Sequence, residues 1–314
     1  MPKTIHNEKR VKSYALLLAH IGALFTVSAW GTSFLSTKVI MAQGGVTPVE
    51  MYIYRFTLAY IILLFLTFRK IKANSWSDEL RFVVCGLCAG SLYFITENYA
   101  LKYTATANVS LLASISPLFT TILMSVVYKV RLLPGVIIGS LIAFIGVACI
   151  IFSSGEGLVI KPKGDILALT ASLSWAIYTL VVKRLIPLYN SFFITRKLFF
   201  YGVVSALPLL FLQKEPLHLN ALVDFHNPEI PLNFLFLALF CSLGAYLIWN
   251  EAMKALGAVT ANNYMYLQPL VTMVASYFLL GEKIYMLGYI GCILILGGLL
   301  ISDKMKWDDR KDIK

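Results

Sequence analysis

Long runs of apolar residues, separated by short polar segments, extend over nearly the whole chain. A helix needs about 20 apolar residues to cross the hydrocarbon of a bilayer, and ten runs approach or exceed this length. The pattern predicts transmembrane helices over 14–41, 47–68, 80–101, 105–128, 132–153, 164–186, 191–212, 232–253, 257–280 and 284–302. We therefore expect an all-α integral membrane protein with ten transmembrane helices and no sizeable soluble domain.

Composition and charge support this prediction and add an orientation. Apolar residues make up 59% of the chain and charged residues 14%, which is typical of a membrane protein. Of the 27 Lys and Arg residues, 18 lie at the two ends and in the connections on the same side, and five lie in the connections on the other side. Cytoplasmic connections carry the excess of Lys and Arg, so both termini are expected to be cytoplasmic, in a cell membrane. The same bias explains the net charge of +11, and we expect the lipid bilayer, not nucleic acid, as a partner.

The second half of the chain repeats the first. A shift of 152 residues superposes Asn98 on Asn250, Pro117 on Pro269, Gly139 on Gly291 and Gly146 on Gly298. Shifts of 145 and 141 superpose Trp30 on Trp175 and Arg55 on Arg196. Each copy has five spans, an odd number, so the two copies enter the membrane from opposite sides. Such inverted repeats are common among secondary transporters.

These observations predict a simple domain organisation. A cytoplasmic N-terminal segment (1–13) precedes the first five-helix repeat (14–153), and a linker (154–163) leads to the second repeat (164–302) and a cytoplasmic tail (303–314). The fourth helix of each copy contains a proline, Pro117 or Pro269. Proline removes a backbone hydrogen bond and clashes with the carbonyl one turn earlier, so both helices should bend. We expect these two bends to act as hinges.

Short motifs occur in order along both copies. The first copy contains A-W-G-T-S-F-L-S-T-K (29–38), A-L-K-Y-T-A-T-A (100–107) and S-P-L (116–118). The second contains A-M-K-A-L-G-A-V-T-A (252–261), Q-P-L (268–270) and L-G-E-K (280–283). In these motifs and their order, the chain resembles the EamA-type transporters of the drug/metabolite transporter superfamily. The resemblance implies ten helices around a central cavity and the movement, in our interpretation the export, of a small metabolite, amino acid or drug-like solute. The acidic residue common after the fourth helix in that family is missing at 128–131, so only Glu282 matches it.

Polar residues inside the spans are candidates for the solute path, because polar side chains that face lipid are unfavourable. The candidate solute-binding residues are Trp30, Ser33, Asn108, Ser110, Ser114, Trp175, Tyr178, Asn262, Tyr264, Tyr266 and Gln268, with Pro117 and Pro269 as hinges. The first copy offers mainly small hydroxyls and the second offers amides and phenols, so the site should be asymmetric. Trp175 and Asn262 should face a central pocket. The alternative is that the small polar residues hold helices together and the tryptophans pack against the bent helices.

Two carboxylates lie well within the spans, Glu97 and Glu251. They can take up protons and so couple transport to a proton gradient. They can instead pair with Arg55 and Arg196, which lie near the same ends of their helices, because an unpaired buried charge is costly. The two carboxylates are two residues out of register under the 152 shift, so they need not face the same way.

Other function classes find less support in the sequence. No G-x-x-x-x-G-K-[ST], H-E-x-x-H or G-x-S-x-G motif occurs, and the four histidines are scattered. We therefore expect no catalytic residues, no cofactor and no bound metal. The alternatives are an intramembrane enzyme that acts on a lipid-linked substrate, and a channel for lipid or solute. The sequence leaves the oligomeric state open between monomer and homodimer.

The predicted orientation can be tested by labelling. In intact cells, a membrane-impermeant maleimide should label a Gln213→Cys variant, because 213 lies in an outer connection, and should not label Lys304→Cys. The five native cysteines fall inside apolar runs and should stay unlabelled. Labelling of Lys304→Cys in unbroken cells would contradict the prediction.

Overall fold

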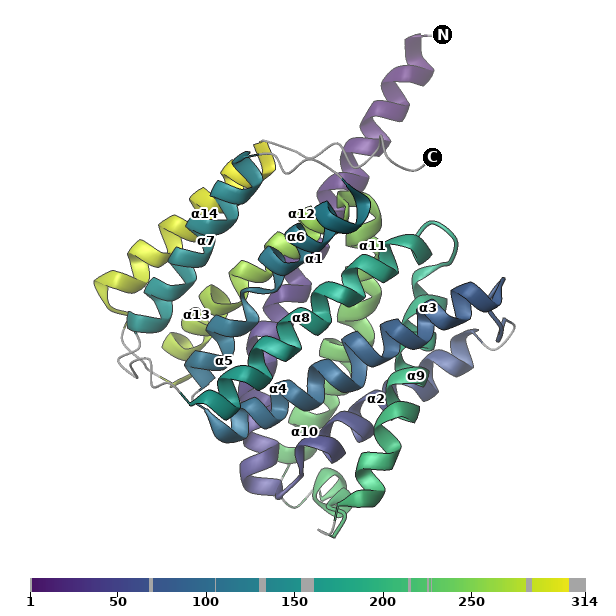
Figure 1. Ribbon diagram of the computed structural model, residues 1–314, viewed down its shortest axis with the longest axis vertical. Helices are drawn as coiled ribbons and strands as arrows, with labels where there is room; N and C mark the ends of the chain where they lie inside the picture. The colour runs from purple at the N-terminus through teal and green to yellow at the C-terminus, as the bar shows by residue number, and fades with distance from the viewer. Residues whose placement is uncertain are drawn as a thin grey trace.

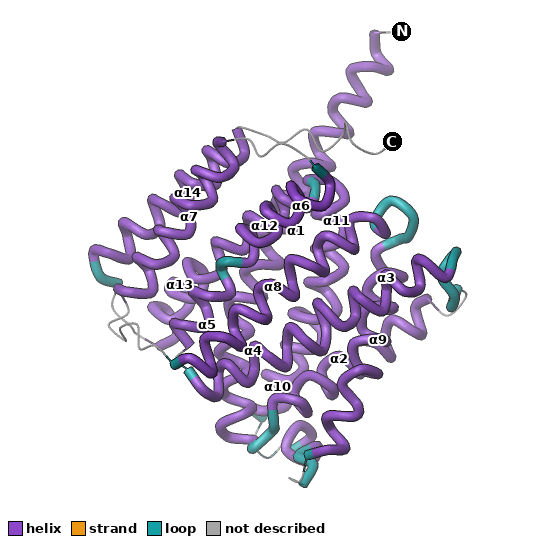
Figure 2. Tube along the Cα trace, in the orientation of Figure 1, coloured by secondary structure: helices purple, strands orange, loops and turns teal. Residues whose placement is uncertain are grey.

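The computed structural model describes residues 2–67, 70–104, 106–129, 134–153, 161–213, 216–224, 226, 228–280 and 284–304. These residues form helices joined by turns and loops, without a strand among them, which confirms the all-α prediction (Figure 2). Eight segments are long and apolar enough to span a membrane: Ser13–Gly44, Pro48–Thr67, Trp76–Tyr103, Val109–Tyr128, Pro134–Ser153, Pro162–Leu185, Ser191–Leu212 and Glu229–Leu256. The interrupted helix over 258–280 and the shorter apolar stretch Met286–Ser302 occupy the remaining two predicted spans.

The first copy contains seven α-helices and one π-helix within the described residues (Figure 1). They are α1 (Pro2–Gly44), α2 (Pro48–Thr67), α3 (Trp76–Gly86), π-helix η1 (Leu87–Ser91), α4 (Leu92–Tyr103), α5 (Thr106–Ala113), α6 (Ser116–Tyr128) and α7 (Pro134–Ser153). Helix α1 begins well before the apolar run that predicted it, and its first turns project beyond the bundle.

The second copy follows the same plan. Its elements are α8 (Pro162–Leu185), α9 (Ser191–Leu212), the 3-10 turn η2 (Leu219–Val223), α10 (Glu229–Leu235), π-helix η3 (Phe236–Gly244), α11 (Ala245–Leu256), α12 (Ala258–Asn263), the 3-10 turn η4 (Tyr264–Leu267), α13 (Gln268–Leu280) and α14 (Met286–Lys304). The predicted domain boundaries stay predictions, because 154–160 and 305–314 lie outside the described residues.

Local sequence signals fix several helix starts. At α2, Thr47 and Glu50 form a capping box: the amide of Thr47 donates to the Glu50 carboxylate at 2.9 Å, and the amide of Glu50 donates to the Thr47 hydroxyl at 3.3 Å. Ser75 caps α3 and Asn190 caps α9, each accepting from the amide three residues on. These caps satisfy amides that a helix start leaves without partners.

The packing has the pattern of a pseudo-twofold axis. Helix α1 packs on α11 and α13, and its counterpart α8 packs on α4 and α6. Helices α7 and α14 lie side by side at one edge of the bundle (Figure 1). There Gly139 of α7 lies against Gly298 of α14, and Gly146 of α7 lies against Gly291 of α14. Because Gly291 is the counterpart of Gly139 and Gly298 is the counterpart of Gly146, the twofold relation turns one contact into the other. Reciprocal contacts of this kind are what a twofold relation produces.

Irregular turns interrupt equivalent helices of the two copies. The π-helix η1 in the third span and the π-helix η3 in the eighth span occupy matching positions under the 152 shift. In the fourth span α5 ends at Ala113 and α6 begins at Ser116, and in the ninth the 3-10 turn η4 precedes α13. Pro117 and Pro269 each stand at the second residue of the helix that resumes. The predicted interruption at both prolines is therefore confirmed.

The glycine contact between α7 and α14 leads to a stability prediction. A Cβ at position 146 would stand 2.7 Å from the Gly291 carbonyl oxygen and 2.8 Å from the Ile295 amide nitrogen, and backbone atoms cannot move aside easily. Gly146→Ala should therefore destabilise the protein by about 1–3 kcal/mol. A Cβ at Gly297 meets nothing within 4 Å, so Gly297→Ala is the matched control. Thermal unfolding in one detergent compares the two, and equal midpoints would refute the packing argument.

Candidate functional site

Trp30 and Trp175 meet at the centre of the bundle. Their ring centroids lie 5.2 Å apart at an interplanar angle of 83°, an edge-to-face arrangement. The two residues are counterparts in the two copies, and a residue that contacts its own counterpart lies on the axis that relates the copies. This contact therefore lies on the pseudo-twofold axis, near the middle of the spans Ser13–Gly44 and Pro162–Leu185.

Further rings surround this pair. Trp249 and Tyr246 lie 5.1 and 5.6 Å from Trp30, and Tyr178 lies 5.1 Å from Trp175. We call these five residues the aromatic cluster. Trp30 is 7% exposed and Trp175 is 2% exposed, so the cluster is closed in this structure and faces neither lipid nor an open channel.

Polar atoms of aromatic and neighbouring side chains cap the two π-helices. Trp30 Nε1 donates to the Cys241 carbonyl of η3 at 2.9 Å, and the Tyr246 hydroxyl donates to the Ala89 carbonyl of η1 at 2.8 Å. Ser174 Oγ donates to the Cys88 carbonyl at 2.6 Å. A π-helical turn disturbs the regular hydrogen bonds of the backbone, and hydrocarbon offers no water to replace them. These bonds therefore anchor the cluster to the irregular turns of both copies.

Asn262 joins the cluster from α12. Its Oδ1 accepts from Trp175 Nε1 at 2.9 Å, and its Nδ2 donates to the Ala258 carbonyl at 2.9 Å and to Thr179 Oγ1 at 3.4 Å. The residue is fully buried, so its amide is used internally here. Trp175 and Asn262 are thus buried and bonded to each other, and the expectation that both face a central pocket stays a prediction.

Arg55 and Glu97 flank the cluster without a direct ion pair between these two described side chains. Arg55 Nε donates to the Leu237 carbonyl of η3 at 3.1 Å, and its guanidinium carbon lies 5.1 Å from the Phe94 ring. Glu97 accepts from the Tyr93 hydroxyl at 2.7 Å. The two charged groups still interact electrostatically. Arg55 thus binds a carbonyl of η3, where the π-helical turn disturbs the regular hydrogen bonds of the backbone.

Arg196 and Glu251 are not paired with each other either, as far as the described atoms go. Arg196 donates to the carbonyls of Thr67 and Lys70, at the C-terminal end of α2, where helix carbonyls have no partners of their own. Glu251 is exposed and accepts from Ser191 Oγ at 2.6 Å. Among the described atoms, Arg196 caps the C-terminal end of α2 in place of the expected ion pair with Glu251.

The other predicted residues are more scattered. Ser33 donates to the Trp30 carbonyl at 2.7 Å and Ser114 to the Ser110 carbonyl at 2.8 Å, so both hydroxyls bond to their own helices. The Tyr264 hydroxyl lies 2.6 Å from His20 Nδ1 of α1. Tyr266 and Gln268 are buried close to Pro269, and Ser110 is partly buried. The side chain of Asn108 lies outside the described residues.

Sequence reasoning did not select Tyr93, Tyr246 or Trp249. Under the 152 shift, Trp249 is the counterpart of Glu97, and Tyr246 is the counterpart of Phe94. Only the pair of Phe94 and Tyr246 is aromatic in both copies, and that match was a usable signal. Gly86 and Gly90 lie against Gly202 of α9, where the lack of side chains lets the two helices approach closely.

Comparison with known proteins identifies the family. The model of the EamA-like transporter family matches residues 17–152 and 162–302. An uncharacterized transporter of Archaeoglobus fulgidus is 28% identical over 90% of this chain and 96% of its own length. The uncharacterized transporter YyaM of Bacillus subtilis is 28% identical over 94% of both chains. A probable terminal-alkyne amino-acid exporter of Streptantibioticus cattleyicolor is 24% identical over 92% of this chain and 94% of its own.

The fold also matches a solved structure. One crystal structure superposes with a TM-score of 0.72 at 19% sequence identity, over 93% of this chain and 97% of that chain. At this identity the likeness concerns the fold alone. The family model matches both halves of the chain, in agreement with the twofold-related bundle of ten segments. The chain therefore belongs to the EamA-like transporter family.

Proposed function

We propose that the protein is a secondary transporter that exports a small, amino-acid-like solute across the cell membrane by alternating access. The observation that carries the proposal is the contact of Trp30 with Trp175 on the pseudo-twofold axis. A rocking of one copy against the other would act on this contact, because each copy supplies one of the two rings. The interruptions at Pro117 and Pro269 give each copy a place to move.

The polar groups around the cluster favour an amino-acid-like solute. Arg55 Nη2, Trp249 Nε1 and the Tyr52 hydroxyl are buried donors that have no hydrogen-bond partner among the described residues. An unsatisfied buried donor is costly, so a ligand that accepts from these groups would be bound tightly. A carboxylate suits the Arg55 guanidinium, and the aromatic faces suit an apolar or cationic part. The amino-acid exporter among the relatives supports this choice, and the relatives' names favour transport over an intramembrane enzyme or a channel.

The substrate and the site can be tested together in proteoliposomes. Vesicles with the purified protein should exchange at least one labelled amino acid from an equimolar mixture. Trp175→Phe removes ring area and the donor to Asn262, so we expect counterflow to fall about tenfold, as for a lost aromatic contact of 1–2 kcal/mol. Trp76→Phe is the matched control, because Trp76 is 90% exposed at the start of α3. A folded Trp175→Phe protein with normal counterflow would remove the cluster from the site.

Proton coupling is proposed for Glu97 and not for Glu251. Glu97 is buried beside the cluster and hydrogen-bonded to Tyr93, whereas Glu251 is exposed. Glu97→Gln keeps the shape but cannot exchange a proton, so uptake driven by an imposed pH gradient should be abolished while solute exchange continues. Glu251→Gln should keep pH-driven uptake. Unchanged gradient dependence in Glu97→Gln would rule out this role.

A further inference from the structure

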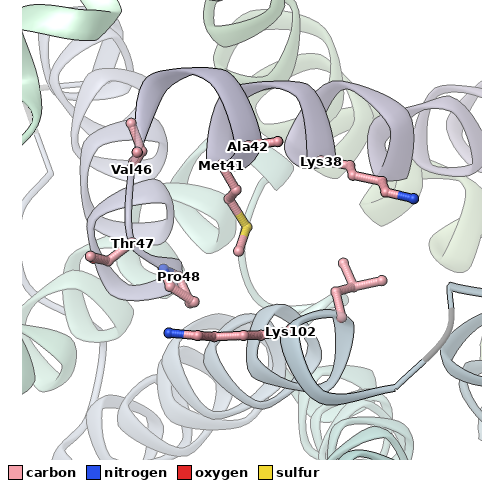
Figure 3. A pocket seen from close by; sticks show the side chains of 9 residues that line it. Lys38, Met41, Ala42, Val46, Thr47, Pro48 and Lys102 are labelled. Carbon is pink, nitrogen blue, oxygen red and sulfur yellow. The ribbon is translucent and has the colours of Figure 1, made fainter.

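A cavity of about 310 Å³ lies away from the aromatic cluster, where α1 joins α2. The end of α1, the link to α2 and the end of α4 form its walls. The lining consists of Lys38, Met41, Ala42, Gly45, Val46, Thr47, Pro48, Leu101 and Lys102. Lys38 and Lys102 lie on opposite walls, and the Met41 side chain points into the space from α1 (Figure 3).

Both charged side chains of this lining are cationic. Lys38 and Lys102 are exposed, and neither forms a hydrogen bond or an ion pair with another described residue. The one hydroxyl of the lining is already used, because Thr47 Oγ1 donates to Gln213 Oε1 at 2.8 Å. The two ammonium groups therefore lie at opposite ends of the cavity, with their donors available (Figure 3).

The carboxylate of Glu50, close to the lining, has hydrogen-bond partners other than Lys38 and Lys102. Glu50 is 0% exposed and accepts from the Thr47 amide at 2.9 Å and from the Tyr54 hydroxyl at 3.1 Å. It also accepts from the His218 amide at 2.6 Å and lies 3.1 Å from His218 Nδ1. This buried carboxylate is bonded to Thr47, Tyr54 and His218, so it does not pair with Lys38 or Lys102.

The walls are fixed by the backbone. Gly45 has a φ of +66°, a conformation that glycine adopts without strain, and it turns the chain between the two helices. The capping box of Thr47 and Glu50 then holds the start of α2, and Asn98 Nδ2 donates to the Pro48 carbonyl at 3.2 Å. The cavity is therefore preformed and is not a gap between loose loops.

We propose that this cavity binds a small anion whose carboxylate or phosphate group lies between Lys38 and Lys102. Two like charges beside low-dielectric walls raise the local concentration of anions. The site lies on residues other than those proposed for transport, so it can exist whichever solute the aromatic cluster accepts. The anion is either a soluble solute or the headgroup of a lipid, since both carry the same chemistry.

Affinity labelling of the full-length protein tests the proposal without a transport assay. Pyridoxal 5′-phosphate condenses through its aldehyde with a lysine amine, releasing water, and borohydride reduces the imine to a stable amine. Pyridoxal has the same aldehyde and no phosphate. In phosphatidylcholine liposomes we expect the phosphate-bearing reagent to label Lys38 and Lys102 about threefold faster than Lys161, the size of an exposed charge interaction. Pyridoxal should label the three lysines alike, and peptide mass spectrometry measures each site.

Variants separate a shared site from two independent lysines. Lys38→Gln should slow the labelling of Lys102 about threefold, and Lys102→Gln should slow that of Lys38 to the same extent. Lys161→Gln is the control, because Lys161 is exposed and lies outside the cavity. It should leave both rates unchanged.

Competition identifies the source of the anion. Protection by inorganic phosphate in phosphatidylcholine liposomes would support a soluble anion. Protection that requires phosphatidylglycerol in the bilayer would support a lipid headgroup. The proposal is overturned if neither anion protects the two lysines, or if the two reagents give the same ratio of labelling to Lys161.

Discussion

The need to satisfy every backbone carbonyl inside hydrocarbon shapes the centre of this protein. The π-helices η1 and η3 and the proline interruptions leave carbonyls without regular helical partners, and no water is at hand to serve them. Side chains of Trp30, Tyr246, Ser174 and Arg55 supply the missing donors. A helix irregularity in one copy is thus repaired by side chains from other helices, and this ties the two copies together at the membrane centre.

The same constraint makes the two copies unequal. Trp30 donates to a backbone carbonyl of η3, while its counterpart Trp175 donates to the side-chain amide of Asn262. The counterpart of Asn262 is Ser110, which is too small for that bond. The backbone of the bundle therefore follows the twofold relation, and the hydrogen bonds at its centre do not. The two copies therefore present different polar groups to the aromatic cluster.

The sequence was sufficient for the ten helical segments, the repeat and both proline interruptions. Hydropathy marks spans directly, and Trp, Pro and Gly at matching positions reveal the repeat because these residues rarely coincide by chance. The π-helices could not be predicted, because a local change of helix winding leaves the apolar pattern as it was. Their effect reaches the charged residues: Arg55 and Arg196 bind backbone carbonyls that no residue pattern announces. The unlike burial of Glu97 and Glu251 could be anticipated, since residues two apart in a helix point to nearly opposite faces.

The edge-to-face contact of the two central tryptophans has one more consequence. In such a pair one ring offers its edge and the other its face, although both rings are the same. Exchanging these parts gives a second arrangement with the same intrinsic energy. In this protein the two indoles have different hydrogen-bond partners, the Cys241 carbonyl for Trp30 and the Asn262 side chain for Trp175, so the two arrangements are not equal in energy. The lean of this central contact is therefore set by the partners of the two indoles and not by the rings themselves.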